Sequence, residues 1–366
     1  MTMALNIHKM DTGKKVGLFV LSAVAMAVLP FLVGGLLGNS WVRIVDFALL
    51  YVMLALGLNI VVGFAGLLDL GFIAFYAVGA YTFALLGSPH FGLHLPFYIT
   101  IPLGAVLAAF FGILLGTPVL RLKGDYLAIV TLGFGEIVRI FMNNLNTPVN
   151  ITNGPQGINL IDPIKVGGVS LGETMNVFGV SFHSVYLYYY LFLALTVGVV
   201  IMAWRLQHSR IGRAWVALRE DDIAAAAMGI NIRNIKLLAF ALGALSGGVA
   251  GGLFASFQGF VSPESFSLLE SIMILAMIVL GGMGHIPGVI LGAVVLTIAP
   301  EILRDVIGPL QMKTFGKMLI DPENARMLLF GLAMVVMMLV RPEGMWPSKR
   351  RKAEFRDDRE AAGQKG

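Results

Sequence analysis

The sequence predicts an all-α polytopic membrane protein with about ten transmembrane helices, several of them interrupted by Gly or Pro. Hydrophobic residues make up 57% of the 366-residue chain and charged residues only 13%, whereas soluble domains carry roughly 25% charged residues. Apolar runs of about 20 residues recur, and each is long enough to cross a hydrocarbon core of ~30 Å. The 44 glycines are dispersed through these runs, which in membrane helices indicates close packing or deliberate breaks.

The expected spans follow the apolar runs, and they lie near residues 16–37, 44–62, 72–87, 97–118, 126–143, 185–204, 237–258, 268–282, 288–303 and 325–341. The first span follows a basic N-terminal segment and so resembles a secretory signal. Its apolar run continues to Leu37, however, and is longer than the ~7–15 residues of a cleavable signal core. We therefore expect an uncleaved first span.

Lys and Arg concentrate in alternate connections between these spans, and the positive-inside rule therefore predicts that both termini are cytoplasmic. The same layout places the loop 205–236 inside and the Asn-, Gly- and Pro-rich segment 144–184 outside. Residues 1–345 then form a single transmembrane domain, and the charged tail 346–366 is expected to be cytoplasmic and disordered. Topology alone explains the net charge of +5, so no nucleic-acid partner is expected.

The loop 205–236 is the most informative segment, because it is a charged island between two long apolar segments. It contains an acidic run from Glu220 to Asp222, directly followed by Ile223 and four alanines. Alanine is the strongest helix former and Gly a common terminator. We therefore expect one short helix from about Arg213 to Gly229, with the acids on its water side, offered to a cytoplasmic partner. The alternative is a solvated charged helix without a partner.

A first interruption lies between Gly57 and Gly71, where four glycines accompany Asn59 and Asp69 at membrane depth. A carboxylate there costs ~2.5–3.5 kcal/mol on insertion scales, so Asp69 must face a cavity, a partner or a helix N-terminus. One interpretation is a discontinuous helix that lines a transport route, with Asp69 capping the next helix. The other is an ordinary tight turn with a routine cap. We favour the break for the segment and leave both open for Asp69.

A second interruption at 280–288 contains Gly282 and Pro287, and paired interruptions in two halves of a transporter often mark inverted repeats and the substrate region. His285 is expected to be an interface histidine in a tight turn rather than a ligand. The glycines of 237–260, spaced by four, predict close helix packing. Glu136 and Arg139 are three apart and can pair on one helix face, as a structural pair or as part of the pathway.

Several classes of function are disfavoured. The chain has no cysteine, no P-loop, no metal-ligand spacing and no grouping of a nucleophile with His and an acid. We therefore expect neither an enzyme nor a bound cofactor. Charged residues are sparse inside the spans, which argues against a proton- or sodium-coupled carrier. A membrane scaffold without transport is disfavoured by the paired interruptions.

These motifs together resemble the LivM-type permease subunits of branched-chain amino acid ABC transporters. The resemblance covers roughly residues 40–345 and is carried by the segments 57–81, 120–137, 152–158, 212–231 and 281–288. It implies an importer of the bacterial inner membrane, in which a periplasmic binding protein delivers Leu, Ile or Val to this subunit and a related LivH-type permease. Two separate ATPase subunits would drive the cycle, which explains the missing nucleotide site.

The resemblance also implies that the loop 205–236 is the coupling element that contacts the ATPases. ABC importers generally carry Glu-Ala-Ala-x-x-x-Gly there, and Ala224, Ala225 and Gly229 match, whereas Ile223 stands at the Glu position. Arg213, Glu220 and Asp221 complete the expected coupling residues, and Asn59, Asp69, Gly71, Glu136 and Gly282 are the pathway candidates. A urea or short-amide permease of the sister group is the alternative, disfavoured because Asp69-Leu70-Gly71-Phe72 replaces its Ser-Leu-Gly-His.

Overall fold

The computed structural model describes residues 12–119, 122, 124–177, 180–315 and short pieces between 331 and 346. The chain is mostly helical, and the helices are α2 (Thr12–Leu37), α3 (Asn39–Asn59), α4 (Ile73–Leu86), α5 (Phe97–Val119), α6 (Asp125–Asn144), α7 (Ser184–Gln207), α8 (Arg210–Glu220), α9 (Asp222–Ala227), α10 (Ile232–Gln258), α11 (Leu268–Gly281) and α12 (Ile286–Phe315). α3 continues directly into a π-helical turn, η1 (Ile60–Phe64). The expected tenth span and the charged tail lie largely outside the described residues.

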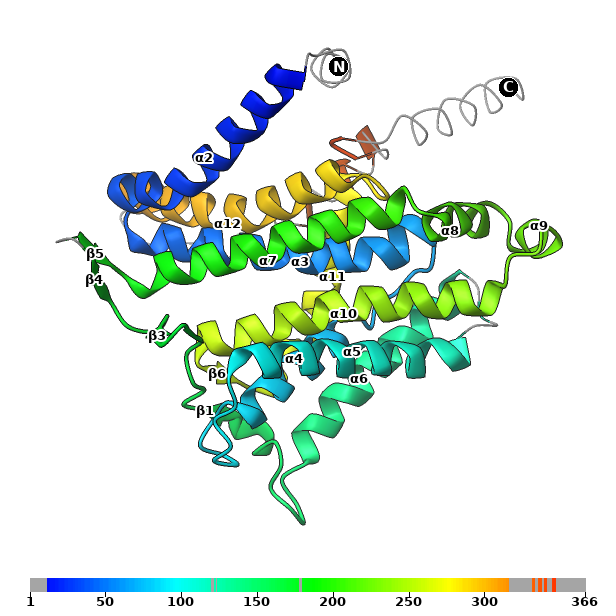
Figure 1. The fold of residues 1–366 in the computed structure, drawn as a ribbon, viewed down its shortest axis with the longest axis horizontal. Helices are drawn as coiled ribbons and strands as arrows, with labels where there is room; N and C mark the ends of the chain where they lie inside the picture. Colours follow the sequence, from blue (N-terminus) through cyan, green and yellow to red (C-terminus); the bar gives the residue numbers. More distant parts are fainter. Residues whose placement is uncertain are drawn as a thin grey trace.

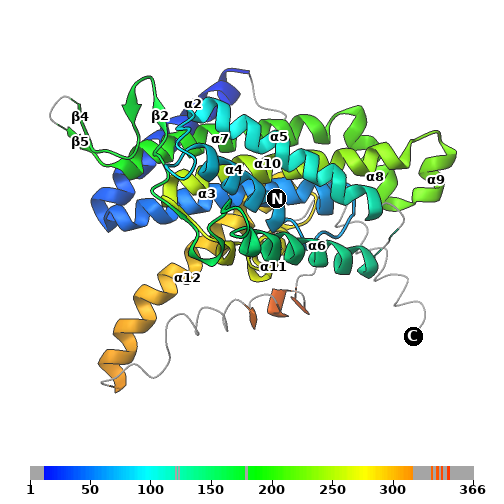
Figure 2. The ribbon, with the colours of Figure 1, turned by 90° about the horizontal axis from the view of Figure 1, so that it is seen from below.

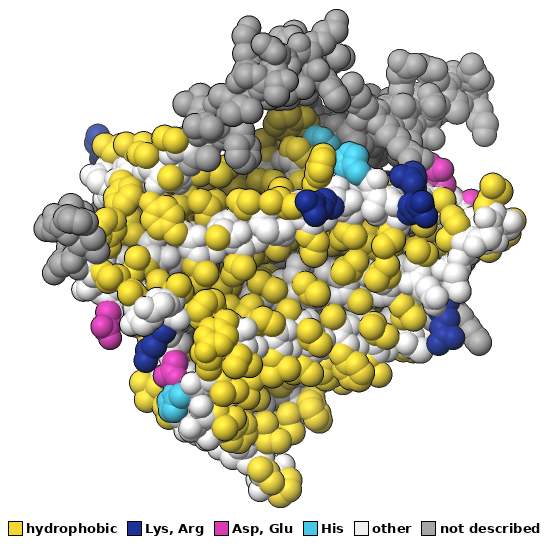
Figure 3. Space-filling view, in the orientation of Figure 1, with side chains coloured by type: hydrophobic (Ala, Val, Ile, Leu, Met, Phe, Trp, Pro, Cys, Tyr) yellow, Lys and Arg dark blue, Asp and Glu magenta, His cyan; other side chains and the backbone are white. Residues whose placement is uncertain are grey.

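Six helical segments among the described residues are long and apolar enough to cross a membrane: Asn39–Phe64, Phe97–Val119, Ser184–Gln207, Ile232–Gln258, Pro263–Gly281 and Ile286–Asp305. Two shorter apolar helices, Val24–Leu37 and Ile73–Leu86, accompany them. A polytopic membrane architecture is therefore confirmed. Figure 3 shows a broad hydrophobic surface across the middle of the molecule, with only a few Lys and Arg side chains on this face.

The segment between α6 and α7 forms short elements rather than another span. A 3-10 turn, η2 (Gly154–Gln156), precedes a series of strands, β1 (Ile158–Asn159), β2 (Lys165–Val166), β3 (Val169–Ser170), β4 (Met175–Val177) and β5 (Val180–Phe182), and β6 (Phe260–Val261) follows α10. They pair as β1–β6, β2–β3 and β4–β5. The all-α prediction therefore misses three small two-stranded sheets. They lie at one end of the molecule and α8 and α9 at the other (Figures 1 and 2).

Helix α10 packs between α4, α5 and α3 because its glycines remove the side chains that would hold the helices apart. A Cβ at Gly248 would lie 2.8 Å from the Gly104 carbonyl oxygen of α5, and one at Gly251 would lie 2.7 Å from the Ala80 nitrogen of α4. On the α3 side, a Cβ at Gly243 would lie 3.0 Å from the Gly57 carbonyl oxygen. The prediction of close packing by this glycine series is confirmed.

Candidate functional site

The charged loop folds as two helices, so the prediction of one helix from Arg213 to Gly229 is wrong. The backbone leaves the helical region at Asp221 (φ −156°, ψ 115°), and the Oδ1 atom of Asp221 accepts from the backbone N–H groups of Ile223 (2.8 Å) and Ala224 (3.0 Å). Asp is a poor interior residue but a strong N-cap. The acids Glu220 to Asp222 therefore lie at a junction between α8 and α9, not in mid-helix.

The two faces of α9 also differ from the expectation. Ala225 is only 4% exposed and packs into this chain, so it does not offer a flat surface to a partner. The outward side chains are Ile223 and Met228, which are 74% and 83% exposed. Gly229 ends the element as predicted, since its φ of +83° suits glycine and its N–H donates to the Ala226 carbonyl (3.0 Å). Ile223 and Met228 are apolar residues within a charged loop, and this pattern is visible in the sequence alone.

Trp215 anchors α8 to the membrane helices. Its side chain is fully buried, its ring stacks on Phe64 of η1 at a centroid distance of 6.5 Å, and its indole Nε1–H donates to the Ile235 carbonyl (2.9 Å). Tryptophan combines a large apolar surface with one donor that must be satisfied when buried. α8 is therefore packed on the π-helical turn and bonded to the start of α10, while Arg213 on the same helix is exposed.

Arg219 connects this element to both interrupted segments. Its Nη1 donates to the Gly63 carbonyl (2.8 Å), and Gly284, from the second interruption, donates its backbone N–H to the Asn59 Oδ1 atom (2.9 Å). A Cβ at Gly284 would lie 3.1 Å from the Gly63 oxygen and 3.5 Å from Arg219 Nη1. Asn59, Gly63, Arg219 and Gly284 thus form one contiguous contact, which we call the junction. The sequence did not reveal this role of Arg219, which counts there only as one of the basic residues that indicate the membrane orientation.

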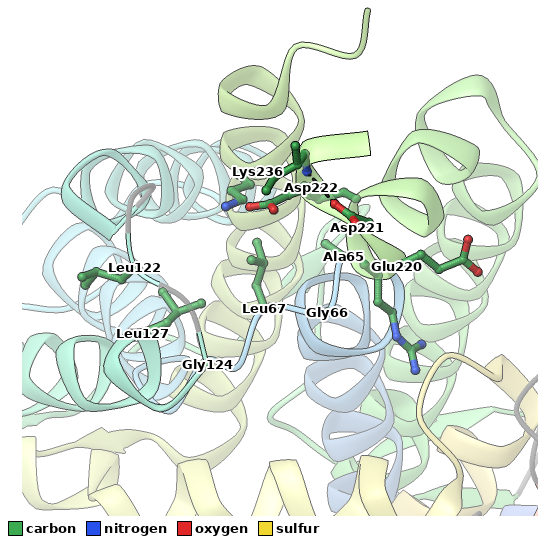
Figure 4. A pocket seen from close by; sticks show the side chains of 13 residues that line it. Ala65, Gly66, Leu67, Leu122, Gly124, Leu127, Glu220, Asp221, Asp222 and Lys236 are labelled. Carbon is green, nitrogen blue, oxygen red and sulfur yellow. Dashed lines mark hydrogen bonds between the residues drawn. The ribbon is translucent and has the colours of Figure 1, made fainter. Parts of the chain in front are cut away.

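An open cavity of about 410 Å³ lies beside the junction, between α8, α9 and the start of α6. Figure 4 shows Leu122 and Leu127 on one side, Leu67 in the centre, and Asp222 with Lys236 on the wall opposite Leu127. Lys236 is buried, with 5% exposure, although its place in the sequence indicates only a charge of the cytoplasmic loop. Asp222 and Lys236 both make interactions, so the charges that line this cavity are not isolated.

The first interruption is a true break between helices, as favoured from the sequence. α3 ends in η1 at Phe64, and α4 does not begin until Ile73. Asp69 is fully buried, and its Oδ1 accepts from the Gly71 N–H (2.9 Å). It closes a turn before α4 instead of capping that helix, since α4 begins after Phe72 without a side-chain cap. Gly71 is required because a Cβ would meet the Thr131 carbonyl oxygen.

The second interruption separates α11 from α12 at Gly282, whose φ is +119°. A later part of the chain contacts this interruption. The Met345 N–H donates to the Leu280 carbonyl (2.7 Å), and the ring of His285 contacts the Trp346 carbonyl (2.8 Å). His285 therefore lies in the connection between the two helices, as expected, and its ring also contacts backbone. Asn59 is part of the junction and Gly282 lies two residues before its Gly284, whereas Gly71 contacts Thr131 of α6.

The predicted pairing of Glu136 with Arg139 is confirmed, with an Nη2–Oε1 distance of 2.5 Å. Arg139 also reaches Glu264 of the 3-10 turn η3 (Pro263–Phe266), at 2.9 Å. Two acids of the expected spans are also buried or bonded: Asp46 is fully buried in α3, and the Tyr51 hydroxyl donates to Glu270 of α11 (3.0 Å). Among the described residues, no group of three His, Cys, Asp or Glu could hold a metal ion.

Comparison with known proteins identifies the family. The model of the branched-chain amino acid transport system / permease component matches residues 40–338. The high-affinity branched-chain amino acid transport system permease protein LivM of Escherichia coli (strain K12) is 44% identical over 346 residues, which are 91% of this chain and 75% of that protein. A probable LivM of Methanocaldococcus jannaschii is 27% identical over 277 residues, 75% of this chain and 74% of that protein.

The chain is also similar to the permease protein LivH of Escherichia coli (strain K12), with 37% identity over 94 residues, 26% of this chain and 30% of that protein. No solved structure matches the chain significantly. The matched region includes both interrupted segments, the junction and α8–α9. The chain therefore belongs to the family of permease components of branched-chain amino acid transport systems.

Proposed function

We propose that this chain is one membrane subunit of an ATP-driven importer of the branched-chain amino acids Leu, Ile and Val. It would form the pathway with a LivH-type permease, receive substrate from a periplasmic binding protein and be driven by two separate ATPase subunits. The similar proteins are named as branched-chain amino acid permeases, which supports this substrate class over urea or short amides. The chain itself would carry no nucleotide site and no cofactor.

The observation that carries the mechanism is the junction. An element whose exposed tip is Ile223 and Met228 is bonded through Arg219 to the first interruption, which in turn is bonded to the second. A partner that moves α9 would therefore pull on both breaks at once. We assign ATPase contact to α8 and α9, including Arg213, Glu220, Asp221, Ala224 and Gly229, and pathway roles to Asn59, Asp69, Gly71, Glu136 and Gly282.

The expected placement is a multi-pass protein of the inner membrane with about ten spans and both termini cytoplasmic. The strands and α8–α9 lie at opposite ends of the molecule, which supports an outer 144–184 segment and an inner 205–236 loop. The Lys and Arg distribution gives the direction.

The test is transport by the complete complex in proteoliposomes, with ATP on the ATPase side and the binding protein with labelled leucine on the other. Leucine should accumulate only with ATP, and labelled urea should not. Leucine uptake driven by an ion gradient without ATP would contradict the ABC mechanism. Uptake of urea in place of leucine would contradict the substrate class.

A further inference from the structure

One lateral face of the molecule, formed by α6, η3 and α11, combines charged and apolar side chains. α6 and α11 lie side by side in Figure 2, and Arg139 of α6 binds Glu264 of η3. The side chains of Glu136, Arg139 and Glu264 are 39%, 24% and 63% exposed, so the cluster is open to its surroundings. Large apolar residues of the same helices are also exposed, namely Ile137, Ile140, Phe141, Leu269 and Ile272.

One charged group of this face, Glu270, lies at the depth of the candidate spans, since it is bonded to Tyr51 within the span Asn39–Phe64. Glu136 is eight residues before the end of α6 at Asn144, roughly 12 Å at 1.5 Å per residue. Tyr51, which holds Glu270, is twelve residues from the start of α3 and thirteen from the end of η1, roughly 18 Å and 20 Å. Glu270, in the first turn of α11, is therefore bonded to a residue near the middle of the α3–η1 span and is only half-buried.

Helix α5 has the kind of surface that lipid would solvate well. Residues Phe97–Val119 contain no charged side chain, and Val106, Phe110 and Leu114 are 62%, 58% and 50% exposed. Hydrocarbon solvates such a surface well but solvates carboxylates poorly, so charged residues within membranes face protein or a water-filled cavity. The α6–η3–α11 face thus needs a cover that α5 does not.

The cover must itself be embedded in the membrane, since a soluble ATPase or binding protein cannot reach this depth. The chain is similar to permeases named LivM and to permeases named LivH, and two chains of one fold commonly pack through equivalent surfaces about a two-fold axis. We propose that the α6–η3–α11 face is the surface on which a second, homologous permease subunit packs, with Glu270 at the seam. This inference rests on the proposed function, because it takes the permease pair from it.

The test uses the complete complex, purified through a tag on the second permease so that every chain assayed is assembled. The photoreactive amino acid p-benzoylphenylalanine replaces Ile137 of α6, Ile272 of α11 or, as the matched control, Val106 of α5, one position at a time. Illumination should join the first two positions to the second permease, identified by mass spectrometry, and the control to lipid only. Attachment from Val106 but not from Ile137 or Ile272 would overturn the assignment.

A second measurement tests the contact between the two permeases independently of transport. Ile137→Trp should lose most of the second permease from a pull-down of this chain, whereas Val106→Trp should retain it. Retention in both variants, or joining of Ile137 to a differently tagged second copy of this chain, would also overturn the proposal. Neither result depends on the substrate, so a complex that carries no leucine can still show the predicted contacts, and a leucine transporter can fail to show them.

Discussion

Replacing Arg219 with Met removes the guanidinium that donates to the Gly63 carbonyl but keeps most of the aliphatic side chain. The aliphatic part packs closely on Gly66, because a Cβ at Gly66 would lie only 2.6 Å from the Arg219 Cγ. A hydrogen bond from a charged donor contributes ~1.5–3 kcal/mol. Arg219 is exposed to solvent, so we take the lower end of this range for its hydrogen bond. We therefore expect the junction to weaken by about 1.5 kcal/mol, a factor of about ten in equilibrium.

The measurement is leucine transported per ATP hydrolysed by the complex in proteoliposomes. Arg219→Met should lower this ratio about tenfold, while the ATPases still co-purify and still hydrolyse ATP. Arg210→Met is the matched control, because Arg210 is exposed on the same helix. Arg219→Lys should restore part of the ratio, because a lysine ammonium also donates.

Two results would refute the reasoning about the junction. One is a wild-type ratio in Arg219→Met, which would mean that the bond to Gly63 transmits nothing. The other is an equal loss in Arg219→Met and Arg210→Met, which would point to the positive charge of α8 rather than to this contact. Loss of the ATPases from the purified complex would instead place Arg219 in the subunit interface.

Three further outcomes are expected. Ile223→Asp should weaken retention of the ATPases in a pull-down roughly tenfold or more, because burying one large aliphatic side chain in the interface contributes ~1.5–3 kcal/mol. Ala226→Ser on the same helix is the control and should leave the retention unchanged. Gly157→Val should lower uptake and thermal stability, since φ is +69° there and a Cβ would meet the Val261 carbonyl, a change that costs more than about 1 kcal/mol. Lys165→Cys and Arg233→Cys, in a chain without native cysteine, should be labelled from opposite sides of the membrane; labelling from one side would overturn the topology.

Composition and periodicity were sufficient for six of the expected membrane helices, the two breaks and the glycine packing of α10. These features depend on local sequence, since an apolar run, a Gly-Pro cluster or a four-residue glycine spacing has the same consequence in any membrane helix. The split of the charged loop at Asp221 could also have been read locally. The high helix propensity of the four alanines concealed a residue that prefers to cap a helix.

The junction and the Tyr51–Glu270 bond could not be predicted in the same way. Arg219 and Gly63 are 156 residues apart and Tyr51 and Glu270 are 219 apart, so only the tertiary fold brings them together. Lys236 shows the same limit, because a lysine at the start of a span looks like a topological charge until its burial is known. Pairwise contacts over such separations leave no periodic signal in a single sequence.

The glycine contacts of α10 have a mechanical consequence for transport. Where backbone lies directly on backbone, as at Gly248 and Gly251, neighbouring helices interlock and cannot slide without separating, so α4, α5 and α10 form one stiff body. Strain that arrives through Arg219 must then be absorbed where the backbone is less regular. The π-helical turn at Ile60–Phe64, at the end of α3, and the bend at Gly282, at the end of α11, are such places.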